Sequence, residues 1–429
     1  MKIAIAGYGL EGKENYAYWS VDPSHDLTIV DESETPTFAV PSDAKTILGS
    51  GAFEKLDGFD LVIRTAGLAP HKIKTDGRVW SATNEFFAKC PADIIGVTGS
   101  KGKGTTASLI ASILETAGRK VWLVGNIGVP GLHILKQVQP EDIVVYELSS
   151  FQLWDVEKSP KTAVVLFIEP DHLNVHKDMA EYVAAKSYIT KFQTEDNLLI
   201  YNAQNEYSLS IAATSVAQKV GYSNELTAHV KDNHFYYGEQ KICSVTILQI
   251  PGEHNQLNAI AAIDAVWQYT HDSVVIEQGL HDFKGLAHRL AFVRTVNDVQ
   301  YYDDSIATTP TSAVAALRAF AAPKVLILGG SDKGSDYRPL LTEIISHARL
   351  RAIVSIGANG MYITSMLDDH SLPLVHRIDS KDMKEIVAMA ASLAQPGDIV
   401  ILSPAAASFD MFKSYSDRGD QFVSAVNAL

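Results

Sequence analysis

The stretch "GSKGKGTT" at residues 99 to 106 contains the residue types of a phosphate-binding loop. It follows an apolar run, "DIIGVT", and precedes "ASLIASILETAG", whose apolar residues recur at helical spacing. In a strand, glycine loop and helix of this kind, backbone N–H groups surround phosphate oxygens and one lysine reaches the outer phosphates. Lys103 is that lysine, so the pattern predicts an ATP site. The alternative is a glycine turn with a purely structural role.

The loop departs from the usual pattern at one position. Gly104 stands where a serine or threonine normally holds magnesium, and the hydroxyl residues Thr105 and Thr106 come one residue later. We expect Thr105 to supply the missing oxygen.

Two further candidates for holding a metal ion end apolar runs downstream of the loop. Glu147 ends "IVVYE", and His172 follows "LFIEPD". Because the carboxyl ends of parallel strands meet at one sheet edge, both side chains are expected near the glycine loop. For each residue alone, a hydrogen-bonded structural role is the alternative.

A second glycine pattern opens the chain. In "KIAIAGYGLEG", the residues Gly7, Gly9 and Gly12 follow an apolar run, and a second run, "LTIV", ends at Asp31. This is the turn and acidic residue of a dinucleotide site. The spacing fits a dinucleotide or another phosphate-bearing ligand, and it does not decide between them.

The elements that must position these residues alternate along the chain. Continuous apolar runs such as "LVIRT", "DIIGVT", "TAVVLFIE", "KVLILGG" and "DIVILSP" are separated by amphipathic stretches. Such runs are typical of parallel strands buried on both faces and joined by helices, so the predicted class is α/β. Changes in the pattern place boundaries near residues 91 and 285, giving domains at 1–91, 92–285 and 286–429.

Composition narrows the class of protein. The 429 residues are 46% hydrophobic and 20% charged, which is ordinary for a globular protein of several domains. A formal net charge of −14 makes nucleic acid an unexpected partner. The two cysteines do not pair in a metal-binding motif, and no apolar stretch reaches the length of a membrane span. We therefore expect a cytoplasmic protein without a membrane span.

The order of the motifs resembles the Mur ligase superfamily, the ATP-dependent amide-forming enzymes of peptidoglycan precursor synthesis. The resemblance covers almost the whole chain. It is carried by "GYGLEG", "GVTGSKGKGTT", "GNIG", "ELSSFQL", "DHL", "AAK", "GEHNQLNAIAA", "HR", "DDSIATTP", "LGGSDKG" and "LSPAAASFDMFKSYSDRG". The last motif is similar to that of the member that adds D-glutamate.

The resemblance implies a Rossmann-like N-terminal domain, a central P-loop domain and a C-terminal Rossmann-like domain. It also implies a role for individual residues. ATP would contact Gly99, Ser100, Lys101, Gly102, Lys103, Gly104, Thr105, Thr106, Asn255, Asn258, Arg289 and Asp304. Two magnesium ions would be held by Thr105, Glu147, His172 and Lys186, the last as a carbamate. Lys103, Asn126, His172 and Lys186 would act in catalysis. Substrates would contact Leu10, Glu11, Asp31, Glu32, Ser33, Lys333, Ser408 and Tyr415.

The implied activity is the ATP-driven addition of D-glutamate to UDP-N-acetylmuramoyl-L-alanine through an acyl phosphate, by a monomeric enzyme. The N-terminal glycine turn would then hold uridine diphosphate rather than a dinucleotide. A folylpolyglutamate synthase shares the "GKG" loop but lacks such an N-terminal domain. A non-enzymatic relative would be expected to lack Glu147, His172 or Lys186, and all three are present.

Overall fold

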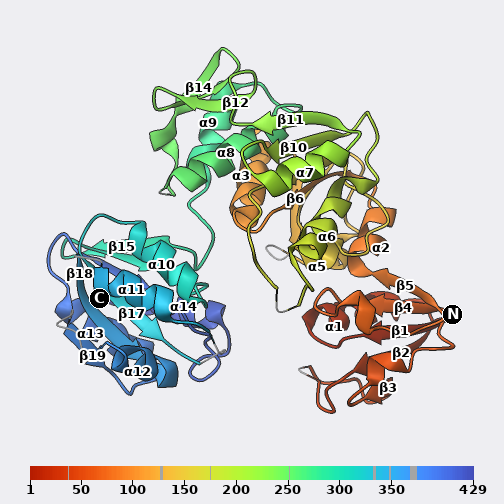
Figure 1. Cartoon of the computed structure of the whole chain (residues 1–429), viewed down its shortest axis with the longest axis horizontal. Helices are drawn as coiled ribbons and strands as arrows, with labels where there is room; N and C mark the ends of the chain where they lie inside the picture. Colours follow the sequence, from red (N-terminus) through yellow and green to blue (C-terminus); the bar gives the residue numbers. More distant parts are fainter. Residues whose placement is uncertain are drawn as a thin grey trace. The chain divides into compact units, whose positions relative to one another are not determined.

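The computed structural model describes every residue except Thr37, 126–128, Asn174, Pro251, 332–334, 347–348 and 368–373. The chain forms two compact units, drawn from red to green and from teal to blue in Figure 1. The first comprises Met1–Gln249 and Glu253–Phe283, and the second Ile250–Gly252 and Lys284–Leu429. Both are built on parallel sheets with helices between the strands, which confirms the predicted α/β class.

The first sheet is parallel throughout, with the strand order β3-β2-β1-β4-β5. Its strands are β1 (Lys2–Ala6), β2 (Asp26–Asp31), β3 (Lys45–Leu48), β4 (Leu61–Arg64) and β5 (Arg78–Ser81). The helices are α1 (Leu10–Trp19) and α2 (Ala82–Lys89), with 3-10 turns at Ala52–Glu54 and Pro70–Lys72. Because β1 lies between β2 and β4, the glycine turn that follows β1 opens at the point where the strand order reverses.

The second sheet of this unit is also parallel, in the order β11-β10-β9-β6-β8-β7. Its strands are β6 (Asp93–Thr98), β7 (Val121–Gly125), β8 (Ile143–Glu147), β9 (Thr162–Val165), β10 (Leu198–Asn202) and β11 (Gln218–Tyr222). The helices are α3 (Lys103–Thr116), α4 (Gly131–Ile134), α5 (Ser150–Leu153), α6 (Met179–Lys191), α7 (Glu206–Thr214), α8 (Glu253–Val266) and α9 (Ser273–Asp282). Strand β6 lies between β8 and β9, so the loop after β6 again opens where the order reverses.

A small antiparallel sheet and a 3-10 turn at Val245–Ile247 complete the first unit. The strands of this sheet are β12 (Ala228–Lys231), β13 (His234–Tyr237) and β14 (Gln240–Ser244). Helix α2 packs Phe86 and Phe87 into the core of the second sheet, against Val144 and Tyr146. The boundary predicted near residue 91 therefore follows a helix that shares its core with the next segment, and the domain boundaries stay predictions.

The second unit contains one six-stranded sheet in the order β15-β16-β20-β17-β18-β19, parallel except for the antiparallel pair β15 and β16. Its strands are β15 (Ala291–Val296), β16 (Val299–Asp303), β17 (Lys324–Gly329), β18 (Leu350–Ile356), β19 (Leu374–Arg377) and β20 (Ile399–Leu402). The helices are α10 (Pro310–Arg318), α11 (Arg338–Ser346), α12 (Gly357–Ser365), α13 (Met383–Leu393) and α14 (Tyr415–Asn427). Among the helices that the structure describes, none has the length and apolar character needed to cross a bilayer.

Candidate functional site

The loop between β6 and α3 has a backbone conformation that depends on glycine. Gly102 immediately precedes α3 and has a φ of +84°, a conformation that other residues rarely adopt. A Cβ atom there would also lie 2.3 Å from the Oδ1 atom of Asn258. The loop therefore needs glycine at this position. It places the N-terminus of α3 at the carboxyl edge of the sheet.

Lys103 begins α3 and places its ammonium group over the loop. Its Nζ atom donates to the carbonyl oxygens of Gly99 and Ser100, both at 3.1 Å. A cation and a helix N-terminus thus meet at one point, which is the arrangement that binds phosphate oxygens.

The two threonines that follow Gly104 differ in their surroundings. Thr106 is fully buried, and its hydroxyl donates to Asn258 Oδ1 at 3.3 Å. Asn258 in turn donates to Asn255 Oδ1 at 3.1 Å, so helix α8 lies directly against the glycine loop. Within the part of the chain that the structure describes, the Thr105 hydroxyl has no hydrogen-bond partner. It is the hydroxyl available to a ligand.

Lys186 lies under the same loop and is 1% exposed. Its Nζ atom donates to the Gly99 carbonyl at 2.8 Å and lies 4.6 Å from the centre of the Tyr182 ring. Burial holds the pKa of Lys186 well below its usual value, and the charge of Lys103 lowers it further. Helix α6 therefore turns Lys186 into the protein rather than toward solvent.

Glu147 and His172 lie near these lysines. Glu147 is the last residue of β8 and is 5% exposed, and its charge partly opposes the fall in the pKa of Lys186. His172 is half-exposed, and its ring packs edge-on against Phe151 with the centroids 4.9 Å apart. Burial lowers the pKa of His172, and the charges of Lys103 and Lys186 act in the same direction. The structure thus brings Lys103, Glu147, His172 and Lys186 near one glycine loop, and their roles stay predictions.

Sequence reasoning missed a cluster beside His172. His176 is 1% exposed, its ring stacks on Phe151 at 5.3 Å, and its Nε2 atom lies 2.9 Å from the Ser150 hydroxyl. Tyr182 joins the cluster to the loop, because its hydroxyl lies 2.9 Å from Ser100 Oγ. The available signal was the second histidine of "DHLNVH", four residues after His172.

The glycine turn after β1 is held by its own acidic residues. Gly7 has a φ of +93°, and a Cβ atom there would lie 2.3 Å from Thr65 Oγ1. The Asp31 carboxylate accepts hydrogen bonds from the backbone N–H groups of Tyr8 and Ser33, at 2.7 and 2.8 Å. Glu11 accepts one from the N–H of Ala66 at 2.8 Å. These two carboxylates therefore shape the turn.

The other residues predicted to bind a substrate here are exposed. They are Leu10, Glu32 and Ser33. Their contact with a ligand stays a prediction.

In the second unit, two loops at the strand ends lie side by side. Ser331 and Ala407 exchange backbone hydrogen bonds, at 2.9 and 3.2 Å. This pairing places Ser331, shortly after β17, beside Ala407, which immediately precedes buried Ser408. Lys333 in the first of these loops, and Asn126 in the first unit, lie outside the described residues.

Asp304 and Tyr415 lie at the same edge of this sheet. Asp304 is 5% exposed and accepts a hydrogen bond from Ser403 Oγ at 2.7 Å, and burial raises its pKa to about 7. The carbonyl of Tyr415 accepts a hydrogen bond from the hydroxyl of Ser305 at 2.7 Å. Arg289 is exposed, and its charge partly opposes the rise in the pKa of Asp304.

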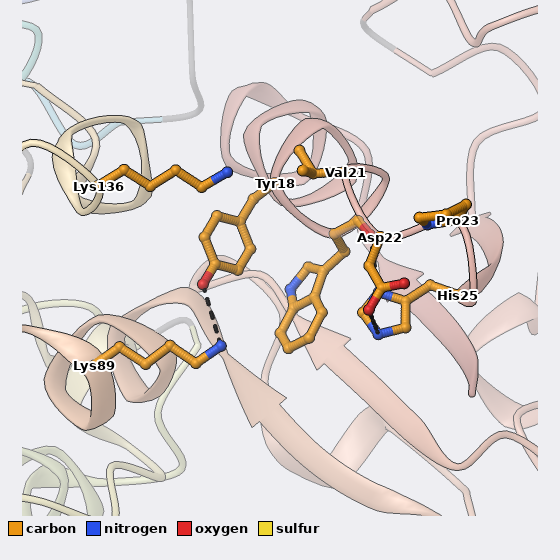
Figure 2. Close-up of a pocket in the computed structure, with 8 residues that line it drawn as sticks. Tyr18, Val21, Asp22, Pro23, His25, Lys89 and Lys136 are labelled. Atoms are coloured by element: carbon orange, nitrogen blue, oxygen red, sulfur yellow. Dashed lines mark hydrogen bonds and ion pairs between the residues drawn. The ribbon is translucent and has the colours of Figure 1, made fainter.

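A surface hollow of the first unit has no connection with the predicted site. It is lined by Tyr18, Trp19, Val21, Asp22, Pro23, His25, Lys89 and Lys136 (Figure 2). The Nζ atom of Lys89 lies 2.6 Å from Glu85 Oε1 and donates to the Tyr18 hydroxyl at 3.5 Å. One of the two lysines that line the hollow is therefore engaged within the protein. None of the predicted residues lines this hollow.

Comparison with known families and sequences gives consistent matches. The model of the Mur ligase middle domain matches residues 97–266, and that of the Mur ligase glutamate ligase domain matches residues 288–406. The UDP-N-acetylmuramoylalanine–D-glutamate ligase of Acetivibrio thermocellus is 38% identical over 456 residues, covering 100% of this chain and 96% of that one. The protein of the same name from Clostridium perfringens is 38% identical over 398 residues, covering 89% and 86%.

Solved structures share the fold at low identity. UDP-N-acetylmuramate-alanine ligase MurC from Thermotoga maritima has a TM-score of 0.60 at 16% identity, covering 100% of this chain and 99% of that one. E. coli FolC in complex with DHPP and ADP has a TM-score of 0.60 at 17% identity, covering 81% and 92%. MurF from Thermotoga maritima in complex with ADP has a TM-score of 0.58 at 16% identity, covering 99% and 93%.

Proposed function

This chain belongs to the Mur ligase family, and on that premise we propose that it is an ATP-dependent ligase that joins D-glutamate to UDP-N-acetylmuramoyl-L-alanine in peptidoglycan precursor synthesis. The observation that carries the proposal is the likeness, over the whole chain, to an enzyme of that name. The grouping of Lys103, Glu147 and Lys186 around one glycine loop supports it.

The reaction has two steps, each with its own leaving group. The terminal carboxylate of the UDP substrate attacks the γ-phosphorus of ATP, which forms an acyl phosphate and releases ADP. The amine of D-glutamate then attacks the acyl carbon, loses a proton and expels inorganic phosphate, leaving an amide. Phosphorylation is needed because a carboxylate is a poor electrophile at neutral pH.

The residues of the first unit serve the first step. Backbone N–H groups at the start of α3 bind phosphate oxygens. Lys103 gives up its hydrogen bonds to the Gly99 and Ser100 carbonyls and binds the outer phosphates instead. Its charge then offsets the negative charge that accumulates on the transferred phosphoryl group. Asn258 accepts a hydrogen bond from Thr106 and donates one to Asn255, and both asparagines would line the nucleotide site.

The residues at this sheet edge fit magnesium. Thr105 offers a hydroxyl and Glu147 a carboxylate, and oxygen ligands of these types together with substrate phosphates are what Mg²⁺ prefers. No cluster of three His, Cys, Asp or Glu side chains suited to a metal occurs among the described residues. Bound magnesium would supply charge neutralisation at the phosphates.

Lys186 takes part as a carbamate, together with His172. An ammonium group cannot hold a cation, whereas a carbamate presents oxygen atoms as a carboxylate does. Burial lowers the pKa of Lys186, which favours the neutral amine, and the neutral amine is the form that adds to carbon dioxide. The addition forms an N–C bond and releases one proton.

The two substrates occupy different parts of the chain. The glycine turn after β1 binds uridine diphosphate. D-Glutamate is held in the second unit by Ser408, Tyr415 and Lys333, since two carboxylates require a cation and neutral donors.

The test is phosphate release from ATP and magnesium by the whole protein. UDP-N-acetylmuramoyl-L-alanine is offered with D-glutamate, L-glutamate, L-alanine or a diamino acid, and a folate with L-glutamate is offered separately. Only D-glutamate with the UDP substrate is expected to release phosphate. Preference for another amino acid, or for the folate, would overturn the assignment.

A further inference from the structure

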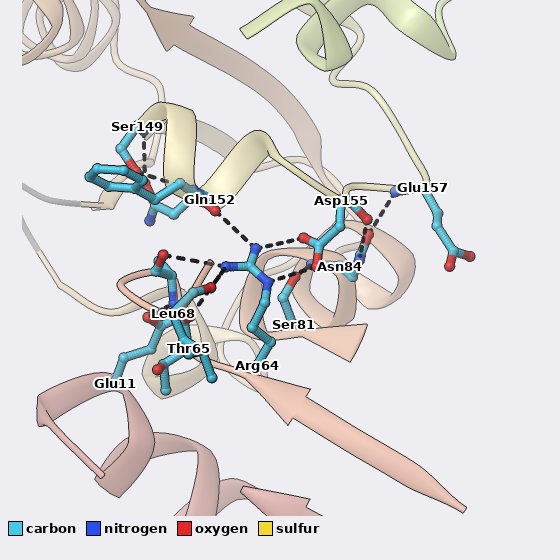
Figure 3. A network of polar contacts seen from close by, with 12 residues as sticks. Glu11, Arg64, Thr65, Leu68, Ser81, Asn84, Ser149, Gln152, Asp155 and Glu157 are labelled. Atoms are coloured by element: carbon cyan, nitrogen blue, oxygen red, sulfur yellow. Dashed lines mark hydrogen bonds and ion pairs between the residues drawn. The ribbon is translucent and has the colours of Figure 1, made fainter. Parts of the chain in front are cut away.

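Arg64, the last residue of β4, makes an unusually complete set of contacts for a buried cation (Figure 3). Its side chain is 0% exposed. Nε and Nη2 donate to the two carboxylate oxygens of Asp155, both at 2.7 Å, and Nη2 also donates to the Phe151 carbonyl at 2.9 Å. Nη1 donates to the carbonyls of Thr65, Ala66 and Leu68 at 3.2, 3.3 and 2.8 Å.

One side of this guanidinium shapes the turn at residues 65–68. That turn braces the glycine turn of the first sheet: the Ala66 N–H donates to Glu11 at 2.8 Å, and the Thr65 hydroxyl donates to the Ala6 carbonyl at 3.0 Å. The Thr65 hydroxyl also occupies the space where Gly7 would carry a Cβ atom. Arg64 therefore acts on the proposed nucleotide end of the site through the backbone.

The other side of the guanidinium holds the segment that follows β8. Phe151 lies on α5, four residues after Glu147, and its ring contacts both His172 and His176. One planar group thus joins the glycine turn of the first sheet to the strand end where the proposed phosphoryl transfer takes place. A guanidinium suits this task, because its donors are fixed in one plane and Asp155 is bound through two parallel bonds.

A second ion pair joins the same two sheets without reaching either end of the site. Arg78 and Glu157 are 2.6 Å apart, and both are more than half exposed. The backbone around Asp155 is also attached by Asn84, which donates to the Asp155 carbonyl at 2.9 Å and accepts from the Glu157 N–H at 2.7 Å. The sheets therefore stay joined when the Asp155 carboxylate is changed.

We propose that Arg64, acting through Asp155, is a positioning residue that fixes the spacing between the two ends of the UDP substrate. The inference rests on the proposed function. A substrate bound at its nucleotide end reacts only when its carboxylate meets the phosphoryl group in the correct geometry, and a displacement of about 1 Å costs about 10²-fold in rate.

The test compares two carboxylate-to-amide variants at the same interface. Asp155→Asn removes the charged partner and leaves the Arg64 bonds to the turn, whereas Glu157→Gln weakens the exposed pair. In Asp155→Asn we expect kcat to fall by about 10- to 100-fold, with the Kd for UDP and the KM for ATP within about twofold of wild type. In Glu157→Gln all three quantities should stay within about twofold.

Several results would overturn the proposal. They are an unchanged kcat in Asp155→Asn, a loss of UDP affinity as large as the loss of kcat, or an equal loss in Glu157→Gln. Arg64→Lys keeps the positive charge but loses the planar guanidinium group, and it should reproduce the selective fall in kcat. If thermal unfolding shows that neither Arg64→Lys nor Asp155→Asn folds, the role of Arg64 is structural and the proposal fails. The absence of turnover in the wild type would instead refute the proposed function.

Discussion

At the scale of single residues, Thr105 and Thr106 are the two hydroxyl residues that could hold the proposed magnesium ion. Thr106 is bound to Asn258, whereas the Thr105 hydroxyl has no partner among the described residues. Thr105→Ala should therefore raise the magnesium concentration needed for half-maximal rate and lower turnover by about 10²-fold, a few kcal/mol of charge stabilisation. Initial rates over a magnesium titration measure both effects. An unchanged magnesium dependence would move the ligand to Thr106 or to water.

The second residue-scale prediction concerns Lys186. Lys186→Ala should lose most activity and regain part of it with an added short carboxylic acid, because a free carboxylate can take the place of the carbamate. Lys103→Ala is the matched control, since a lost cation cannot be replaced by an acid. Phosphate-release rates with and without acetate or propionate decide the matter. Absence of rescue, together with an unmodified lysine in an electron-density map, would contradict the carbamate.

The third concerns the amino-acid substrate. A lysine–carboxylate contact is worth about 1.5 to 3 kcal/mol. Lys333→Ala should therefore raise the KM for D-glutamate by about 10- to 100-fold and leave the KM for the UDP substrate nearly unchanged. Steady-state kinetics with each substrate varied in turn provide the measurement. An equal effect on both substrates would remove Lys333 from the amino-acid pocket.

At this scale, the sequence allowed some residues of the candidate site to be named and gave no information on their contacts. A glycine loop is a contiguous sequence motif, so Lys103 could be predicted from its neighbours in the sequence alone. The burial of Lys186 and His176 could not be predicted, because it depends on how α6 and the segment before it pack against the glycine loop and α5. Sequence spacing alone carries no information on which loop a helix will cover.

At the scale of the elements, the apolar runs predicted the strands because parallel strands buried on both faces have no polar side. The runs "LVIRT", "DIIGVT" and "DIVILSP" contain β4, β6 and β20, and all three strands pair in parallel. The packing of α2 on the second sheet was not predictable. Phe86 and Phe87 reveal an apolar helix face, but nothing local says which core receives it.

Helix α8 provides a test of stability against pH. Asp264 is 3% exposed and accepts the Ala228 N–H at 2.9 Å, and burial raises its pKa from 3.8 to about 7. The folded state favours protonated Asp264 more than the unfolded state does. The contribution of this preference to the free energy of unfolding is complete below about pH 4 and is lost as the pH rises through about 7. Asp264→Asn should therefore be more stable than wild type at pH 8, by up to a few kcal/mol, and similar to it at pH 4. Thermal unfolding at both pH values measures this; a variant less stable than wild type at pH 8 would contradict the reasoning.

At the scale of the whole molecule, two parallel-sheet units place the proposed chemistry at strand ends where the order reverses. Both glycine turns of the first unit open at such points, and Arg64 connects the turn after β1 with the segment that follows β8. The sequence predicted each turn separately. It could not predict this connection, because Arg64 and Asp155 lie 91 residues apart and neither belongs to a motif.

In the proposed reaction, ATP activates the substrate carboxylate as an acyl phosphate before D-glutamate attacks. The most direct measurement uses UDP-N-acetylmuramoyl-L-alanine in which both oxygen atoms of the terminal carboxylate are a heavy isotope. It is incubated with ATP, magnesium and D-glutamate. Since the acyl C–O bond breaks when phosphate leaves, one labelled oxygen should appear in each molecule of released phosphate and the other should remain in the product amide. Released phosphate without label, or label found in AMP, would contradict the account.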